Sequence, residues 1–155
     1  MERIKDSDVH QFTLDGLRLQ CKVVSCHDGD TARVITMFPW SSAPQKLTLR
    51  LAGIDAPEIN PRVHDLDRDA IRHRAKVSRN ALIRKVTNCP VRLDDVDLSP
   101  SDLQKILDTN TKLIDASMGR FDAFGRVLAT LYADGVDVNQ AMIQEGYATP
   151  FGSIA

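Results

Sequence analysis

Two short acidic turns hold the side chains best suited to chemistry. One reads Asp-Gly-Asp-Thr over residues 28–31, and the other reads Asp-Ala-Pro-Glu over residues 55–58. A hard cation such as Ca²⁺ takes several oxygen ligands from carboxylates and backbone carbonyls, so acids from two loops could share one cation. Asp-Gly is also an ordinary turn sequence. Each turn by itself therefore leaves two interpretations open, a metal site or a plain solvated turn.

Glu58 ends the second turn and is one of only three glutamates, against eighteen aspartates, among the 21 acidic residues. Its side chain is longer than that of an aspartate. Beside a metal it could reach a water molecule that the metal ligands cannot reach, which suits a general base. The alternative is an acid that simply meets solvent in a loop.

Two arginines lie next to turns. Arg50 belongs to the alternating run Leu-Thr-Leu-Arg-Leu-Ala and faces away from the flanking leucines, while Arg126 follows a glycine at the start of another apolar run. A guanidinium on a strand beside an acidic loop can hold a phosphate with two parallel hydrogen bonds. Either arginine could instead form a structural ion pair.

The segments that must position these residues have the periods of strands and helices. Period-2 alternation and bounding turns predict strands at 17–24, 31–37, 46–52, 91–93, 112–116 and 126–132. Helical spacing and capping residues predict helices at 67–86, 99–109 and 138–145. The first three strands follow one another as a meander. The first acidic turn lies between the first and second of these strands, and the second acidic turn lies just beyond the third.

The composition is that of one globular domain. The chain has 155 residues, of which 43% are hydrophobic and 26% charged, and its net charge is -1. The charge is uneven, because residues 61–92 hold nine Lys and Arg against three Asp, a balance of +6 that leaves -7 elsewhere. This basic segment could face phosphates or could be a solvated helix face.

Cysteine usage and the N-terminal residues bear on the compartment. The three cysteines, Cys21, Cys26 and Cys89, cannot all pair within one chain, so we expect reduced thiols. The first residues hold no apolar run fit for a signal peptide, and the composition indicates no membrane span. We therefore expect an intracellular protein; a leader removed from the natural protein would make it a secreted one.

Taken together, five segments resemble the staphylococcal nuclease-like (thermonuclease) family in order and spacing. They are Asp-Gly-Asp-Thr at 28–31, Leu-Arg-Leu-Ala-Gly-Ile-Asp-Ala-Pro-Glu at 49–58, Phe-Gly-Arg-Val-Leu-Ala-Thr-Leu-Tyr-Ala-Asp-Gly at 124–135, Val-Asn at 138–139 and Glu-Gly-Tyr-Ala at 145–148. The resemblance covers about 17–151. It implies an α+β fold, a five-stranded OB-fold (oligonucleotide-binding) β-barrel with about three helices, in a single domain over 1–155. One predicted helix falls in an insertion at about 94–110.

The resemblance also implies a metal site. Asp30 and Asp55 match the carboxylate ligands of a catalytic Ca²⁺, and Thr31 would give a backbone carbonyl. Asp28 matches an acid near the metal that does not bind it directly. Ca²⁺ is therefore the expected cofactor.

Catalytic roles follow from the same resemblance. Glu58 matches the glutamate that activates or orients the attacking water, while Arg50 and Arg126 match the two arginines that hold the phosphate and stabilise its transition state. Phe124 stands where secreted members of the family carry a tyrosine. We expect it to contact the nucleic acid, together with Arg79 and Arg84 of the basic segment.

The function that this resemblance implies is a Ca²⁺-dependent endonuclease or phosphodiesterase that hydrolyses DNA, RNA or both and leaves 3′-phosphate ends. The alternative is a non-catalytic nucleic-acid-binding OB-fold module, since copies of this domain in larger eukaryotic proteins keep the barrel and lose the acids. None of the matching acids and arginines is lost here. A structural adaptor that uses the helix at 94–110 is a third interpretation, as an added function. No obligate protein partner and no membrane is indicated.

Overall fold

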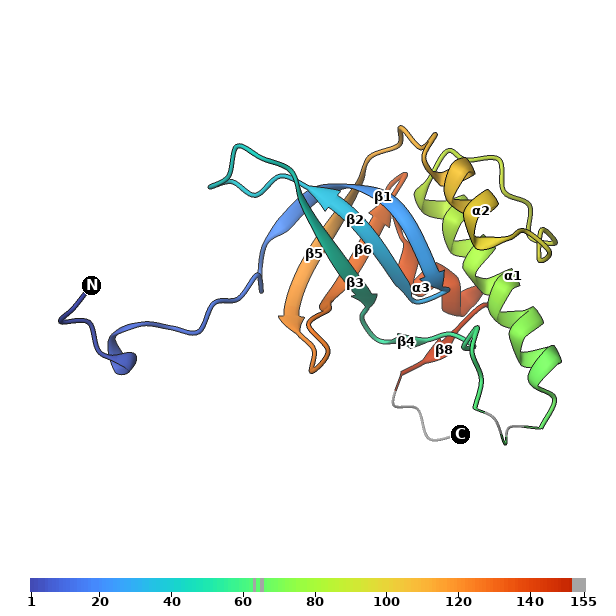
Figure 1. The fold of residues 1–155 in the computed structure, drawn as a ribbon, viewed down its shortest axis with the longest axis horizontal. Helices are drawn as coiled ribbons and strands as arrows, with labels where there is room; N and C mark the ends of the chain where they lie inside the picture. Colours follow the sequence, from blue (N-terminus) through green and yellow to red (C-terminus); the bar gives the residue numbers. More distant parts are fainter. Residues whose placement is uncertain (63, 65, 152–155) are drawn as a thin grey trace.

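The computed structural model describes residues 1–62, 64 and 66–151, and Figure 1 shows the barrel that they form. Its five strands are β1 (Arg18–Asp28), β2 (Thr31–Thr36), β3 (Gln45–Leu51), β5 (Ile114–Phe121) and β6 (Val127–Ala133). β1 pairs antiparallel with β2 and β5, β2 pairs with β3, and β5 pairs with β6. β3 and β6 run parallel and close the barrel. This is the OB-fold strand order, so the predicted fold class is confirmed.

The predicted single domain runs to residue 155, and its residues 63, 65 and 152–155 lie outside the described ranges.

Four short elements accompany the barrel strands. They are a 3₁₀ turn and three two-residue strands: η1 (Asp6–Asp8), β4 (Ile54–Asp55), β7 (Val136–Asp137) and β8 (Thr149–Pro150). β4 pairs with β8, and β7 pairs with β6. None of these short elements was predicted, because two or three residues are too few to show a period.

Alternation along the strands turns aliphatic side chains into the barrel. In β6 every second residue from Val127 to Ala133 is buried, and the residues between them are partly exposed. β1 buries Leu19, Cys21 and Val23 in the same way. The buried cluster consists of aliphatic, methionine and cysteine side chains, and no aromatic residue belongs to it.

Three helices lie together on one side of the barrel (Figure 1): α1 (Arg68–Val86), α2 (Pro100–Leu107) and α3 (Val138–Gln144). α1 packs on β1, and α3 packs on α1 and β6. Ser99 caps α2 as predicted, because its Oγ accepts a hydrogen bond from the backbone N–H of Asp102 at 3.1 Å, with Pro100 at the first helical position. No helix in the described ranges has the length and apolar content that crossing a membrane requires.

The predicted insertion at 94–110 is part of the core. α2 buries Leu103 and Leu107 in the main hydrophobic cluster. Gln104 Nε2 donates to the carbonyl of Val24 at 2.9 Å, and the buried Asn110 Nδ2 donates to that of Val23, also at 2.9 Å. The segment therefore packs on the barrel beside β1, and removing it would expose apolar core.

Three predicted strands differ from the structure by more than one residue. The strand predicted at 112–116 is β5, which begins two residues later and ends five residues later. β1 continues to Asp28, four residues beyond its predicted end, because the ladder shifts between Val23 and Ser25 and interrupts the alternation. The predicted strand at 91–93 is not a strand. There, the side-chain amide of the buried Asn80 donates to the carbonyls of Arg92, Leu93 and Asp95, and these bonds replace those of a strand partner.

Residues 1–13 lead away from the barrel in Figure 1 and are exposed throughout. Leu14 is the first buried residue of the chain, and it belongs to the main hydrophobic cluster. The N-terminal segment is thus anchored on the barrel from Leu14 onward.

Candidate active site

The barrel brings the two acidic turns together at one end of β3. In the pairing of β2 with β3, Thr31 lies opposite Arg50, and the backbone N–H of Leu51 donates to the carbonyl of Asp30 at 2.8 Å. The second turn follows directly, since β4 contains Asp55. Strand pairing therefore places residues that are distant in sequence beside one another.

Asp30 is the buried acid of the site, with 6% of its surface exposed. Its Oδ1 accepts a hydrogen bond from the Thr31 hydroxyl at 3.0 Å, and its Oδ2 accepts one from the backbone N–H of Ala56 at 2.8 Å. These bonds hold the carboxylate in place and tie the first turn to the second. The sequence predicted a carbonyl of Thr31 as a metal ligand; the contact found for Thr31 is that of its hydroxyl with Asp30.

Arg50 lies between the acids of the two turns. Its Nη2 is 3.4 Å from Asp30 Oδ2 and 3.2 Å from Asp55 Oδ1, so both carboxylates converge on one nitrogen. Its Nη1 donates to the carbonyls of Leu51 and Ile54 at 3.0 and 2.9 Å. The guanidinium is thereby held at a fixed place where positive charge meets two acids.

Asp28 and Glu58 add negative charge to the same end of the barrel. Burial raises the pKa of Asp28 above its ordinary value, and the nearby charges of Asp30 and Glu58 raise it further. The backbone N–H of Ile59, which donates to Asp28 Oδ1 at 3.1 Å, and His27 act in the opposite direction. Glu58 is exposed to solvent. Three carboxylates therefore share one electrostatic field, which favours a cation.

The first turn lies directly on helix α1. A Cβ on Gly29 would be 1.9 Å from Ser78 Oγ and 2.9 Å from Ser78 Cβ, so no larger residue fits without a shift. Ser78 is buried, and its hydroxyl donates to the carbonyl of Tyr147 at 2.8 Å. The position of Asp28 and Asp30 thus depends on close packing against a distant helix.

Arg126 is held by the turn between β5 and β6. Its Nε donates to Asp122 Oδ2 at 2.7 Å, and the backbone N–H groups of Arg126 and Phe124 each donate to Asp122 Oδ1 at 2.9 Å. Burial raises the pKa of Asp122, but these hydrogen bonds and the Arg126 charge outweigh burial and lower it below its ordinary value. Asp122 therefore stays ionised and orients Arg126.

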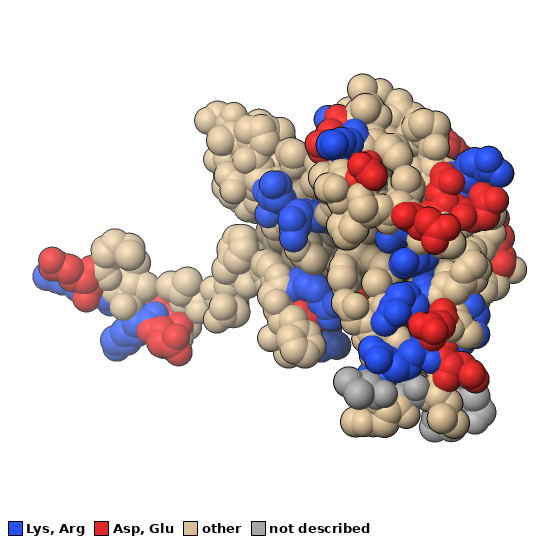
Figure 2. Space-filling view, turned by 45° about the vertical axis from the view of Figure 1, so that its right-hand side comes forward, with Lys and Arg blue, Asp and Glu red and all other residues tan. Residues whose placement is uncertain are grey.

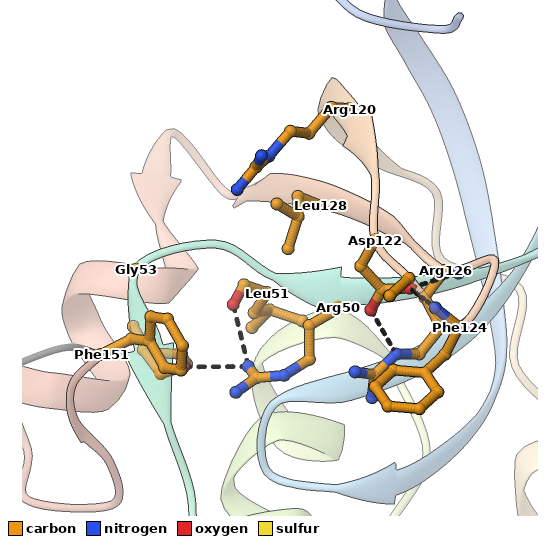
Figure 3. Close-up of a pocket in the computed structure, with 11 residues that line it drawn as sticks. Arg50, Leu51, Gly53, Arg120, Asp122, Phe124, Arg126, Leu128 and Phe151 are labelled. Carbon is orange, nitrogen blue, oxygen red and sulfur yellow. Dashed lines mark hydrogen bonds and ion pairs between the residues drawn. The ribbon is translucent and has the colours of Figure 1, made fainter.

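A pocket of about 390 Å³ separates the two arginines (Figure 3). Its walls combine arginine and apolar side chains, with Arg120 and Leu128 on one side and the rings of Phe124 and Phe151 on others. The Phe151 ring centroid is 5.9 Å from Arg50 Cζ, and that of Phe124 is 5.5 Å from Arg126 Cζ. Guanidinium groups backed by flat rings suit a phosphate joined to a nucleoside.

The three predicted nucleic-acid contacts differ in position. Phe124 is 83% exposed at the pocket, and Arg84 is exposed on α1, where its Nη1 donates to the carbonyl of Val91 at 2.9 Å. Arg79 is buried and donates to Asn80 Oδ1, and burial lowers its pKa. Arg79 therefore does not lie on an exposed basic patch, which corrects that prediction. Figure 2 shows basic and acidic side chains interleaved on the face that it presents.

Four further residues were missed by sequence reasoning. Asp122 has a recognisable signal, because Asp-x-x-Gly is a turn sequence whose carboxylate often accepts backbone N–H groups. Ala56, Arg120 and Phe151 carry no such signal, since they join the site only through the pairing of strands and the return of the chain at β8.

The donor set bears on metal binding. Within residues 1–62, 64 and 66–151, no group of three or more His, Cys, Asp or Glu side chains is arranged to hold a metal ion. Asp30 and Asp55, however, converge on the same nitrogen, and Asp28 and Glu58 add charge nearby. Two carboxylates supplemented by carbonyl and water oxygens match what Ca²⁺ accepts. The residues present therefore fit a hard cation that keeps part of its ligands from backbone or solvent.

An OB-fold barrel that gathers acids and arginines at one end, beside a pocket with aromatic walls, defines a nuclease-like OB-fold protein. Comparison with known families agrees, since residues 48–153 match the family model described as staphylococcal nuclease homologue. The chain belongs to that family, whose members act on nucleic acids. The match includes Arg50, Asp55, Glu58 and Arg126, while the first acidic turn lies before it. A search of curated proteins found no match.

Proposed function

We propose that the protein is a Ca²⁺-dependent phosphodiesterase that cleaves DNA or RNA within the strand and leaves 3′-phosphate ends. The observation that carries this proposal is the convergence of Asp30 and Asp55 on Arg50, beside the pocket that also holds Arg126. Hydrolysis of a phosphodiester needs an activated water, positive charge that neutralises the phosphate, and accurate positioning. Each need has a candidate residue here.

Asp30 and Asp55 would hold the cation, with Asp28 close by and the Thr31 carbonyl as the further ligand that the family resemblance implies. When bound, Ca²⁺ would supply positive charge to the phosphate and orient the reacting groups. Because Asp30 is fixed by Thr31 and Ala56, its carboxylate needs little rearrangement to bind.

The remaining steps belong to side chains of the chain itself. Glu58 would take a proton from the attacking water, whose oxygen forms a new bond to phosphorus while the bond from phosphorus to the 5′ oxygen breaks. The departing 5′ oxygen would take a proton from solvent and leave as a hydroxyl group. Arg50 and Arg126 would donate hydrogen bonds to the negative charge that develops on the phosphate. Asp122 would keep Arg126 oriented toward the pocket.

The alternative, a non-catalytic binding module, is disfavoured by the same residues. A module that only binds has no need of a buried Asp30 or of a second acid directed at the same nitrogen, because acids repel phosphate. The adaptor interpretation gains no support from α2, since two of its residues lie in the core of the barrel.

Cleavage assays test the proposal. Labelled single- and double-stranded DNA and RNA are incubated with Ca²⁺, Mg²⁺ or EDTA, and the product ends are identified by sensitivity to a 3′-phosphatase. We expect cleavage in Ca²⁺, far less in Mg²⁺, which demands stricter octahedral geometry, and none in EDTA. Equal rates in Ca²⁺ and EDTA, or 5′-phosphate ends, would contradict the proposal.

Glu58→Gln separates catalysis from binding. The substitution keeps the shape and removes the base, so we expect turnover to fall by about 10² or more while substrate affinity is retained. Glu2→Gln is the matched control, because Glu2 is an exposed glutamate of the N-terminal segment. Turnover equal in the two variants would remove Glu58 from the mechanism.

A further inference from the structure

The aromatic residues of this protein avoid its core. The chain has one Trp, two Tyr and five Phe, and none of the eight is buried. Large aromatic side chains usually contribute much of a core. Here the fully buried side chains are not aromatic, Phe38 and Tyr147 pack against the core from outside, and five of the eight rings are exposed.

Four of these rings form one cluster, the aromatic platform, which consists of Phe12, Phe38, Trp40 and Phe121. They come from the N-terminal segment, the loop at 37–44 between β2 and β3, and the end of β5. Phe38 and Trp40 are stacked, with centroids 4.9 Å apart and ring planes 4° from parallel. Phe12 touches both sides of the cluster, at 6.4 Å from Trp40 and 6.2 Å from Phe121.

The platform is preformed and open. Trp40 is 60% exposed although Phe38 covers one of its faces, and Phe12 is 61% exposed. Contacts between rings already restrict their rotation, so a flat ligand would bind with little further ordering of side chains. A flat, exposed π-face favours another flat ring as its ligand.

The platform and the pocket of the candidate active site share one hairpin. Phe121 lies in the same β5–β6 hairpin as Arg120, Phe124 and Arg126, which line that pocket. No acidic residue occurs in the loop at 37–44, and the lobe that this loop forms at the upper left of Figure 2 carries no charged side chain. A strand of phosphates held by the arginines could therefore pass the platform without meeting an acid of this loop.

We infer that the aromatic platform stacks unpaired bases of a single-stranded stretch of the substrate, outside the site of cleavage. This inference rests on the proposed function, because its occupant is the same nucleic acid. Base stacking on aromatic side chains tolerates any sequence, since every base has a π-face. The exposed flat rings, the uncharged loop at 37–44 and the hairpin shared with the arginine pocket favour a nucleic acid over a protein partner or a second copy of this chain.

The only tryptophan, Trp40, reports on the platform directly. The Glu58→Gln variant in EDTA is titrated with an oligothymidylate of about 12 nucleotides, within the span of one OB-fold, and with a duplex of equal length. We expect saturable quenching of Trp40 fluorescence by the single strand and weak quenching by the duplex. Equal quenching by both would overturn the inference, because paired bases cannot stack on the platform.

Substitutions distinguish stacking from general contact. Trp40→Ala should weaken binding of the labelled single strand about tenfold in fluorescence anisotropy, whereas Trp40→Phe should keep most of the affinity. Val136→Ala, at the exposed turn between β6 and β7, is the control and should bind like the parent. Circular dichroism checks that each variant is folded. Unchanged affinity in folded Trp40→Ala would overturn the inference.

Two outcomes keep this inference separate from the proposed function. If the wild-type protein cleaves nothing in Ca²⁺ while Trp40 is still quenched by single strands and Trp40→Ala binds less tightly, the platform stands and the nuclease proposal fails. If Trp40 emission changes with protein concentration alone, and Trp40→Ala converts a dimer into a monomer in sedimentation, the platform is a self-association surface and the inference is wrong.

Discussion

The two arginines of the candidate site are held in opposite ways. Arg126 is bound by Asp122, which lies four residues earlier in the same hairpin turn. Arg50 is bound by Asp30 and Asp55, which reach it from two turns, one of them beyond a strand pairing. The first arrangement is local and needs only its own turn. The second needs β2 to be paired with β3, which brings Asp30 to Arg50 across the sheet.

This difference predicts how each arginine responds to damage. The contact of Arg126 with Asp122 is partly exposed, with 31% and 15% of the two side chains accessible. That of Arg50 with Asp30 is more enclosed, at 13% and 8%. Asp30 has less contact with water than Asp122, so losing its charged partner should cost more folding free energy. Activity and stability should therefore be coupled at Arg50 and separable at Arg126.

Arg50→Ala should have the largest effect. It removes a phosphate ligand and leaves Asp30 and Asp55 facing each other without a cation, so we expect kcat/KM to fall by about 10² to 10³ and the unfolding free energy by about 3 kcal/mol in EDTA. Ca²⁺ should recover part of the stability by replacing the lost positive charge. Arg33→Ala, on an exposed position of β2, is the control. Equal melting of the variant and wild type in EDTA would contradict the comparison.

Arg126→Ala should lower activity strongly and stability only slightly. The transition state loses one charge partner, so kcat/KM should fall by about 10², whereas the partly exposed ion pair contributes only about 1 kcal/mol to folding. Denaturation by urea and calcium titration by calorimetry measure the two effects. A loss of stability as large as that of Arg50→Ala would mean that the hairpin contact is not local in its consequences.

Gly29→Ala should lower activity least of the three variants, and it tests the long-range support of the acids. The new Cβ would press on Ser78, which we expect to cost about 1 to 3 kcal/mol and to weaken Ca²⁺ binding by displacing Asp28 and Asp30. Ser78→Gly removes the opposing Cβ and Oγ, so the double variant should regain Ca²⁺ affinity relative to Gly29→Ala. Failure of this rescue would show that the turn is not positioned by α1.

The same division between local and distant contacts governs what the sequence could predict. α1 begins one residue after its predicted start and ends at its predicted last residue, because its apolar spacing is a local signal. The turn at Asp134 and Gly135 has positive φ at both residues, as its sequence indicates. The closing pair of β3 with β6 has no local signal, and neither do the three carbonyls that Asn80 binds.

The candidate site divides along the same line. Its acids and arginines could be selected from the sequence because they match a family pattern, and the structure brings Asp30, Arg50 and Asp55 into contact. Arg79 was selected only because its neighbours are basic, and it proves to be buried. Charge counted along a chain does not say which face of a helix each charge occupies, so that prediction had no physical means of separating inside from outside.

A core without aromatic rings also determines how this protein can be observed. Ultraviolet emission and near-ultraviolet dichroism arise from aromatic side chains, all of which lie at or near the surface here. A change in the emission of Trp40 would then report on the platform, and it could appear while the barrel is intact. The barrel itself is built on methyl-bearing side chains, so methyl resonances and far-ultraviolet dichroism are the signals that follow its unfolding. Different spectroscopic signals therefore follow the surface rings and the barrel core.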